Sequence, residues 1–233
     1  MSIENFIQKS LSDLDLIADH DGEVVYSAES TLGKGDFYYL GLNPGGAGHV
    51  KVGEHLRRFN GRKENAFFDE VWSNGNGHPA QGGAPLQRRV QCLFDDFFKC
   101  DTRNVFATNL IFKTTPSAAT LNYGLAGYCW RVHERALKIV RPKVIISCGN
   151  GSSGSAFSFI SDIYDGKCHE EKFGNFSMKT TTVKIFGENV LVLGFPHLSR
   201  FDPMANDDFK RYLMDVAGHL CKPSLGSVLR NHG

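Results

Sequence analysis

Three polar side chains follow apolar segments of the chain. Asn43 lies in the turn Gly41-Leu42-Asn43-Pro44-Gly45-Gly46, Asn109 ends the apolar run 104–109, and His197 follows the run 189–195. An amide both donates and accepts hydrogen bonds, which matches the edge of a pyrimidine. Each residue also has a simpler interpretation, because such an asparagine can cap a turn and a histidine can be a satisfied polar group. Their shared position after apolar runs favours a functional role.

The elements that must position these residues are read from the apolar pattern. Continuous rather than alternating apolarity is typical of parallel strands covered on both faces. Helical spacing of apolar residues separates these runs, for example along 121–140. The predicted buried strands are 37–42, 104–109, 143–148 and 189–195, with an additional edge strand at 179–186 and further helices at 86–99, 153–164 and 206–220.

Strands that alternate with helices predict an α/β fold. We expect a three-layer α/β/α sandwich with a central, mostly parallel four-stranded sheet. The 233 residues suit one domain over 1–233, with an N-terminal helical extension at 1–30 and a flexible tail at 222–233. In such sheets ligands bind outside the carboxyl ends of the strands, which is where the three polar residues lie.

The composition is that of an ordinary globular protein, 41% apolar and 22% charged, with a formal net charge of +1. This balance excludes a protein held on nucleic acid by gross charge alone. It hides an acidic stretch at 1–42 and basic stretches at 51–63 and 131–143. The simpler interpretation of such charge runs is solvated surface, and they leave open a local basic face.

No apolar run approaches a membrane span and no secretory signal is evident, so we expect a cytoplasmic protein without a membrane partner. The six cysteines contain no C-x-x-C pair, so we predict no metal site and reduced thiols.

One glycine loop allows a different function. Residues 149–154 fit G-x-G-x-x-G between a strand and a helix, a spacing that can hold a phosphate at a helix N-terminus. The acid expected about 20 residues later is poorly matched, because Glu170 and Glu171 follow no clear strand. A nucleotide-cofactor enzyme is therefore a minor alternative.

Four segments in order resemble the uracil-DNA glycosylase superfamily. The opening turn resembles its G-[L/M/I]-N-P-G motif, and the strand ending in Asn109 resembles the strand that ends in a base-reading asparagine. Residues 142–150 are similar to its P-K-V-I-x-x-x-G-N segment. The stretch His197-x-Ser199-x-x-x-Pro203-x-Ala205-Asn206 is similar to the single-strand-selective monofunctional branch. The resemblance spans residues 37–221.

The resemblance implies an enzyme that flips a base out of DNA and hydrolyses its N-glycosidic bond, without a cofactor and as a monomer. Asn43 would hold the attacking water and His197 would stabilise the negative charge on the departing base. Asn109 would hydrogen-bond the base edge, with Gly41 and Leu42 beside it. The substrate would be uracil or a related modified pyrimidine in single- or double-stranded DNA.

The resemblance also implies residues that contact the strand and stack on the base. Ser199 and Arg200 would hold the DNA, with Arg200 or Leu198 as a wedge in the emptied stack. Arg57 and Arg58 would contact phosphates. Phe59 is the expected stacking ring, with Phe67 and Phe68 as alternatives.

Asn43 stands where the family's most efficient members carry an aspartate that activates water, as in its slower, asparagine-bearing branches. This difference keeps open an alternative function: a catalytically inactive protein of this fold that binds nucleic acid or a nucleotide.

Overall fold

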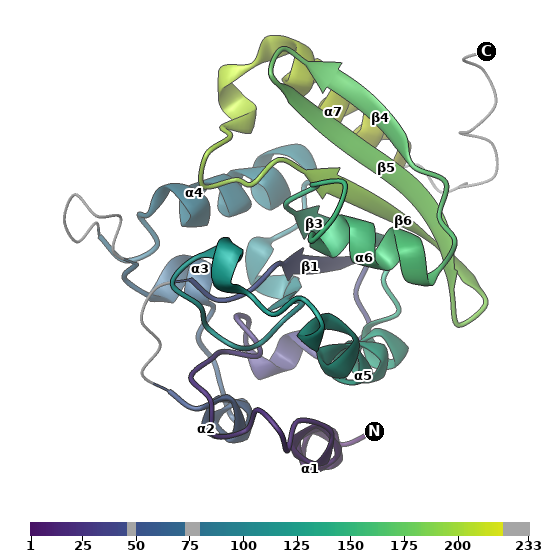
Figure 1. Cartoon of the computed structure of the whole chain (residues 1–233). Helices are drawn as coiled ribbons and strands as arrows, with labels where there is room; N and C mark the ends of the chain where they lie inside the picture. The colour runs from purple at the N-terminus through teal and green to yellow at the C-terminus, as the bar shows by residue number, and fades with distance from the viewer. Residues whose placement is uncertain (46–49, 73–79, 221–233) are drawn as a thin grey trace.

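The computed structural model describes residues 1–45, 50–72 and 80–220, and it has an α/β fold built around one sheet (Figure 1). The sheet has six strands in the order β2-β1-β3-β6-β5-β4. The strands are β1 Phe37–Gly41, β2 Phe106–Asn109, β3 Val144–Cys148, β4 His169–Phe173, β5 Phe176–Ile185 and β6 Glu188–Phe195. The first four in the sheet order are parallel, and β5 and β4 run antiparallel to their neighbours.

Helices pack on both faces of this sheet (Figure 1). One face is covered by α1, α2, α5 and α6, and the other by α3, α4 and α7. Their bounds are α1 Ile3–Asp13, α2 Val52–Arg58, α3 Ala66–Asp69, α4 Pro85–Gln91, α5 Leu125–Val140, α6 Ala156–Ile163 and α7 Asp207–Leu220. A π-helical segment, Cys92–Phe97, continues α4.

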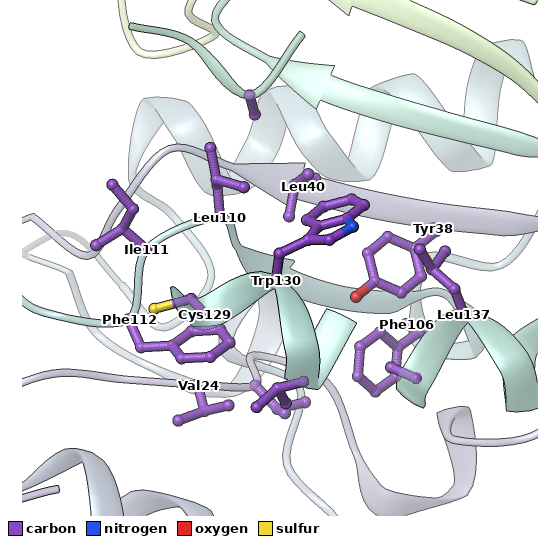
Figure 2. Close-up of a cluster of buried hydrophobic side chains, with 14 of the residues drawn as sticks. Val24, Tyr38, Leu40, Phe106, Leu110, Ile111, Phe112, Cys129, Trp130 and Leu137 are labelled. Atoms are coloured by element: carbon purple, nitrogen blue, oxygen red, sulfur yellow. The ribbon is translucent and has the colours of Figure 1, made fainter. Parts of the chain in front are cut away.

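Successive strand residues supply two separate cores, because side chains alternate across a strand. Tyr38 and Leu40 of β1 join the core beneath α5, whereas Tyr39 between them packs on the opposite side. Figure 2 shows the first core, to which Trp130 of α5 contributes together with Tyr38 and Leu40 of β1. The predicted strands thus form the buried centre of the sheet, which explains their continuous apolarity.

The predicted four-stranded sheet is wrong in its strand number. A β4–β5 hairpin extends the sheet, and β5 lies between β6 and β4 rather than at the edge. Four of the five residues of β4 are exposed, so the strand has no apolar pattern. The Gly174-Asn175 turn, with Gly174 at φ 61°, was its sequence signature.

The N-terminal extension is helical only in α1. Residues 22–26 instead run along the free side of β2, where Tyr26 N–H donates to the Ala107 carbonyl (2.8 Å) and Val25 bridges Thr108. Gly22 permits this approach, since a Cβ there would lie 2.0 Å from the Phe112 oxygen. The segment brings two residues, Glu23 and Tyr26, to the carboxyl end of the sheet.

The predicted tail at 222–233 lies outside the described residues. Within the described part of the chain, no helix has the length and apolarity to cross a membrane.

Two buried histidines make the stability of this fold depend on pH. His133 lies between the Tyr38 hydroxyl, 2.9 Å from Nδ1, and the Leu110 carbonyl, 3.2 Å from Nε2. His55 accepts the Val24 N–H at Nδ1. The pKa of each is lowered from 6.5 to about 4, chiefly by burial, to which the charges of Arg62 and Arg58 add at His55. Both rings are therefore neutral in the fold.

We predict that the free energy of unfolding decreases as the pH falls from 6.5 towards 4, because only the unfolded chain takes up these protons. At pH 5 the loss is about 1–2 kcal/mol per histidine. Urea unfolding at pH 7 and pH 5 measures it. His133→Phe should reduce the pH dependence, whereas the exposed control His169→Gln should leave it unchanged; equal slopes in all three proteins would contradict the assignment.

Candidate functional site

A pocket of about 840 Å³ opens at the carboxyl ends of β1, β2, β3 and β6. Its size falls in the range of about 300–1,000 Å³ typical of small-molecule sites. The sheet order turns back at β1 and β3, so the pocket lies where an α/β sheet is expected to bind ligands. The lining residues used below are Glu23, Tyr26, Tyr39, Gly41, Leu42, Asn43, Phe67, Glu70, Trp72, Asn109, Cys148, His197 and Ser199.

The three polar residues singled out in the sequence meet in this pocket. Asn43 follows β1, Asn109 ends β2 and His197 follows β6, and all three line the cavity. The parallel register explains the meeting, because strand ends that are far apart in the sequence share one edge of the sheet. Gly41, Leu42 and Ser199 line it with them.

Gly41 and Asn109 approach each other closely in the site. They are paired across β1 and β2, and a Cβ on Gly41 would lie 2.0 Å from Asn109 Oδ1. Only glycine leaves room for this amide, so the glycine of the turn fixes where the amide of the next strand can lie.

The Asn43 amide is oriented by its neighbours. Nδ2 donates to the Pro44 carbonyl and to Thr115 Oγ1, each at 2.9 Å. A carbonyl oxygen only accepts, so the atom facing it is the nitrogen. Among the described residues Oδ1 has no hydrogen-bond partner, which leaves an acceptor oxygen on a residue of the pocket lining.

His197 is held in one tautomer by Ser199. Its Nδ1 lies 3.2 Å from the Ser199 backbone N–H and 2.7 Å from the Ser199 hydroxyl. A backbone N–H only donates, so Nδ1 accepts and the neutral ring carries its hydrogen on Nε2. Desolvation by the surrounding atoms, with Arg200 adding to it, lowers the pKa of His197 below 6.5. The ring is a neutral Nε2–H donor near pH 7.

The loop that carries His197 is anchored on β3. Leu198 N–H donates to Cys148 Sγ at 3.4 Å, and Tyr39 lies within hydrogen-bonding reach of the same thiol. Burial raises the pKa of Cys148, so the sulfur is a neutral thiol. Leu198 itself is fully buried, which removes it as a wedge for DNA.

Four aromatic residues of the pocket lining pack against one another and form an aromatic wall: Tyr26, Tyr39, Phe67 and Trp72. Phe59 is not part of it. Phe59 is buried between Phe6 and Phe106 in the core beneath α5, and this corrects the expected stacking ring. Phe59 directly follows the exposed Arg57 and Arg58 at the end of α2, and these charged neighbours concealed its burial.

Phe67, one of the two alternatives, does line the pocket and packs against Trp72 at a ring distance of 5.6 Å. Tyr39 lies 5.4 Å from Phe67, and Tyr26 lies 6.0 Å from Trp72. The other alternative, Phe68, packs beneath Arg103 outside the pocket lining.

Sequence reasoning missed an acidic part of the lining. Glu23 and Tyr26 arrive on the segment beside β2, and Glu70 follows α3. Glu70 accepts from Trp72 Nε1 at 2.9 Å and pairs with Arg62 at 2.8 Å. The short run Val24-Val25-Tyr26 has strand-forming residues, which was the available signal for the segment.

The expected phosphate-contacting arginines lie outside the pocket lining. Arg57 and Arg58 are exposed on α2, and Arg58 pairs with Glu54. Arg200 is exposed in the loop after His197, directly after the pocket-lining residue Ser199.

The glycine loop at 149–154 is tied to strands β5 and β6 of the sheet through Asn150. Asn150 Nδ2 donates to the carbonyls of Ser177 (2.6 Å) and Gly194 (3.1 Å). The chain then continues through α6 into an antiparallel hairpin, where Glu170 and Glu171 are exposed on β4. This arrangement lacks the acid at the end of a neighbouring parallel strand that dinucleotide binding requires.

Within the described residues, no three His, Cys, Asp or Glu side chains gather in a way that would hold a metal ion. Comparison of the chain with models of known protein families and with curated proteins gave no match.

We predict that Gly41→Ala destabilises the protein by about 1–3 kcal/mol, the usual range for overpacking, because the new methyl group displaces Asn109. Gly127→Ala is the matched control, since a Cβ there meets nothing within 4 Å and the residue lies in α5. It should be neutral or stabilising. Urea unfolding measures both, and equal effects of the two substitutions would contradict the Gly41–Asn109 contact.

Proposed function

We propose that the protein is a DNA glycosylase that hydrolyses the N-glycosidic bond of uracil or a related modified pyrimidine after base flipping. The observation that supports this proposal is that Asn43, Asn109 and His197 line one pocket together with aromatic rings. These are the residues at which the chain resembles the uracil-DNA glycosylase superfamily.

The reaction adds water to C1′ of the sugar while the bond from C1′ to the base nitrogen breaks. The bonding electrons leave with the base, and positive charge develops on the sugar. Water loses a proton as the new C–O bond forms, and the departing base takes up a proton. The groups that accelerate this reaction stabilise negative charge on the base and orient the water.

His197 suits the first task. Its Nε2–H donor is set by the Ser199 contact to Nδ1, so no rearrangement is needed when charge develops on a base oxygen. Asn43 suits the second task, because its amide nitrogen is occupied and its oxygen is left to accept a hydrogen bond from water. An amide orients water without taking its proton, which predicts a slow enzyme.

The aromatic wall and Asn109 suit the flipped base. Stacking on rings such as Phe67 and Trp72 holds a base without regard to sequence, and the Asn109 amide meets its edge. We place the DNA strand along the His197 loop, where Ser199 and Arg200 are exposed.

The alternative is a protein of this fold that binds nucleic acid without cleaving it. It is favoured by one observation, the amide Asn43 at the position of the water-orienting group. Salt-dependent DNA binding without base release would support this alternative.

We predict that the protein releases base from oligonucleotides that contain uracil or a modified pyrimidine, measured as abasic sites that alkali cleaves. His197→Ala should lower the rate of release about 10²–10³-fold, the usual effect of removing one donor to a developing oxyanion. His169→Ala, an exposed histidine on β4, is the control and should leave the rate unchanged. The proposal would be contradicted if, on every substrate, the unsubstituted protein formed abasic sites no faster than His197→Ala does.

The rate of release should depend on pH through His197. Protonation of Nδ1 removes the hydrogen bond from the Ser199 backbone N–H and reverses the one with the Ser199 hydroxyl, and the lowered pKa places this change below pH 6.5. We therefore expect a constant kcat/KM from pH 8 to pH 6.5 and a decline at lower pH. His197→Gln keeps an N–H donor that does not titrate and should lose this decline; a midpoint above pH 6.5 would contradict the assignment.

A further inference from the structure

Glu23 is a pocket residue with a carboxyl group that the reaction above does not use. It is fixed through its backbone, since Glu23 N–H donates to the Phe112 carbonyl at 3.0 Å and the next residues follow β2. The Tyr26 hydroxyl lies within hydrogen-bonding reach of both Glu23 and the side chain of Asn109. Glu23 and the base-reading amide are thus joined through one hydroxyl.

The two acids of the pocket lining differ in their partners. Glu70 has an ion pair with Arg62 and a hydrogen bond from Trp72. Glu23, by contrast, has no ion pair among the described residues, and Tyr26 is its side-chain contact. Burial, together with the nearby Glu70 charge, raises the pKa of Glu23, although the contact with Tyr26 and the charge of Arg62 act in the opposite direction. Its oxygens retain capacity to accept hydrogen bonds from a ligand.

A carboxylate only accepts, so the ligand group that faces it must donate. The edge of a cytosine-type base presents an exocyclic amino group, and carboxylates are the side chains that accept from it. Uracil presents a carbonyl oxygen at the same position, which a carboxylate repels. Asn109, beyond Tyr26, can donate to the neighbouring ring nitrogen of cytosine.

We propose that Glu23 is a specificity-determining residue that selects pyrimidines with an exocyclic amino group, the cytosine class, over uracil. This inference rests on the proposed function and names the base that the same pocket prefers. The cavity of about 840 Å³ has room for a ring substituent as well as the base.

The test is single-turnover release from oligonucleotides with one central uracil, cytosine or 5-hydroxymethylcytosine. We expect the unsubstituted protein to release at least one of the two cytosine bases faster than uracil. Glu23→Gln should lower that ratio at least tenfold, because an amide can turn its oxygen to an amino group or its hydrogens to a carbonyl oxygen and so no longer discriminates between the two bases. Glu188→Gln, an exposed carboxyl at the start of β6, is the matched control and should leave the ratio unchanged.

Binding of the free bases gives a readout that needs no turnover. In NMR titrations, cytosine should bind the unsubstituted protein more tightly than uracil, and Glu23→Gln should remove the difference. A ratio that Glu23→Gln leaves within twofold, or equal losses for all bases, would overturn the specificity proposal.

The two proposals fail in different ways. Release of uracil alone, with no Glu23-dependent binding of cytosine, overturns the specificity proposal and supports the glycosylase. Glu23-dependent binding of cytosine with no release of any base supports the amino-group recognition and overturns the glycosylase.

Discussion

The close approach of Asn109 to Gly41 is the constraint on which the rest of the site depends. It joins the ends of β2 and β1, and a single methyl group on Gly41 would occupy the place of the Asn109 oxygen. The other parts of the pocket are set relative to this pair. β3 lies beside β1 and carries Cys148, which holds the loop of His197 through the Leu198 N–H. The Asn109 amide, the Asn43 oxygen and the His197 ring therefore line one cavity at the carboxyl ends of the strands.

The sequence predicted the strands that carry the three polar residues, because buried parallel strands have a continuous apolar pattern. It did not predict the β4 strand, which is polar on nearly every residue and pairs only through its hairpin. The convergence of Asn43, Asn109 and His197 was predictable from the parallel order alone. The aromatic wall could not be predicted in this way, because the packing of a short helix determines which of its rings faces the pocket. Phe59 directly follows one short helix and Phe67 lies in the next, yet only Phe67 lies on the pocket side of the sheet.

The segment beside β2 that carries Glu23 and Tyr26 could not be placed from the sequence for a different reason. Glu23 and Tyr26 reach the pocket through backbone contacts with Ala107 and Phe112, which lie more than 80 residues away in the chain. The local sequence does not indicate which distant strand such a segment pairs with. The uneven charge along the chain now has a structural counterpart, since Glu23 of the acidic N-terminal stretch lines the pocket while the arginines of α2 lie outside its lining. The pocket itself is acidic, and this argues for selection of a neutral base with donor groups rather than for attraction of phosphates.

The central claim is that one pocket receives a base from DNA and positions it for bond cleavage. The most direct measurement is a crystal structure with an oligonucleotide whose target nucleotide carries a 2′-fluoro group, which slows cleavage by disfavouring positive charge on the sugar. We expect the base inside the pocket, with its edge at Asn109, one oxygen near His197 Nε2 and a water on Asn43 Oδ1. DNA bound with its bases stacked, or with the base held away from these three residues, would contradict it.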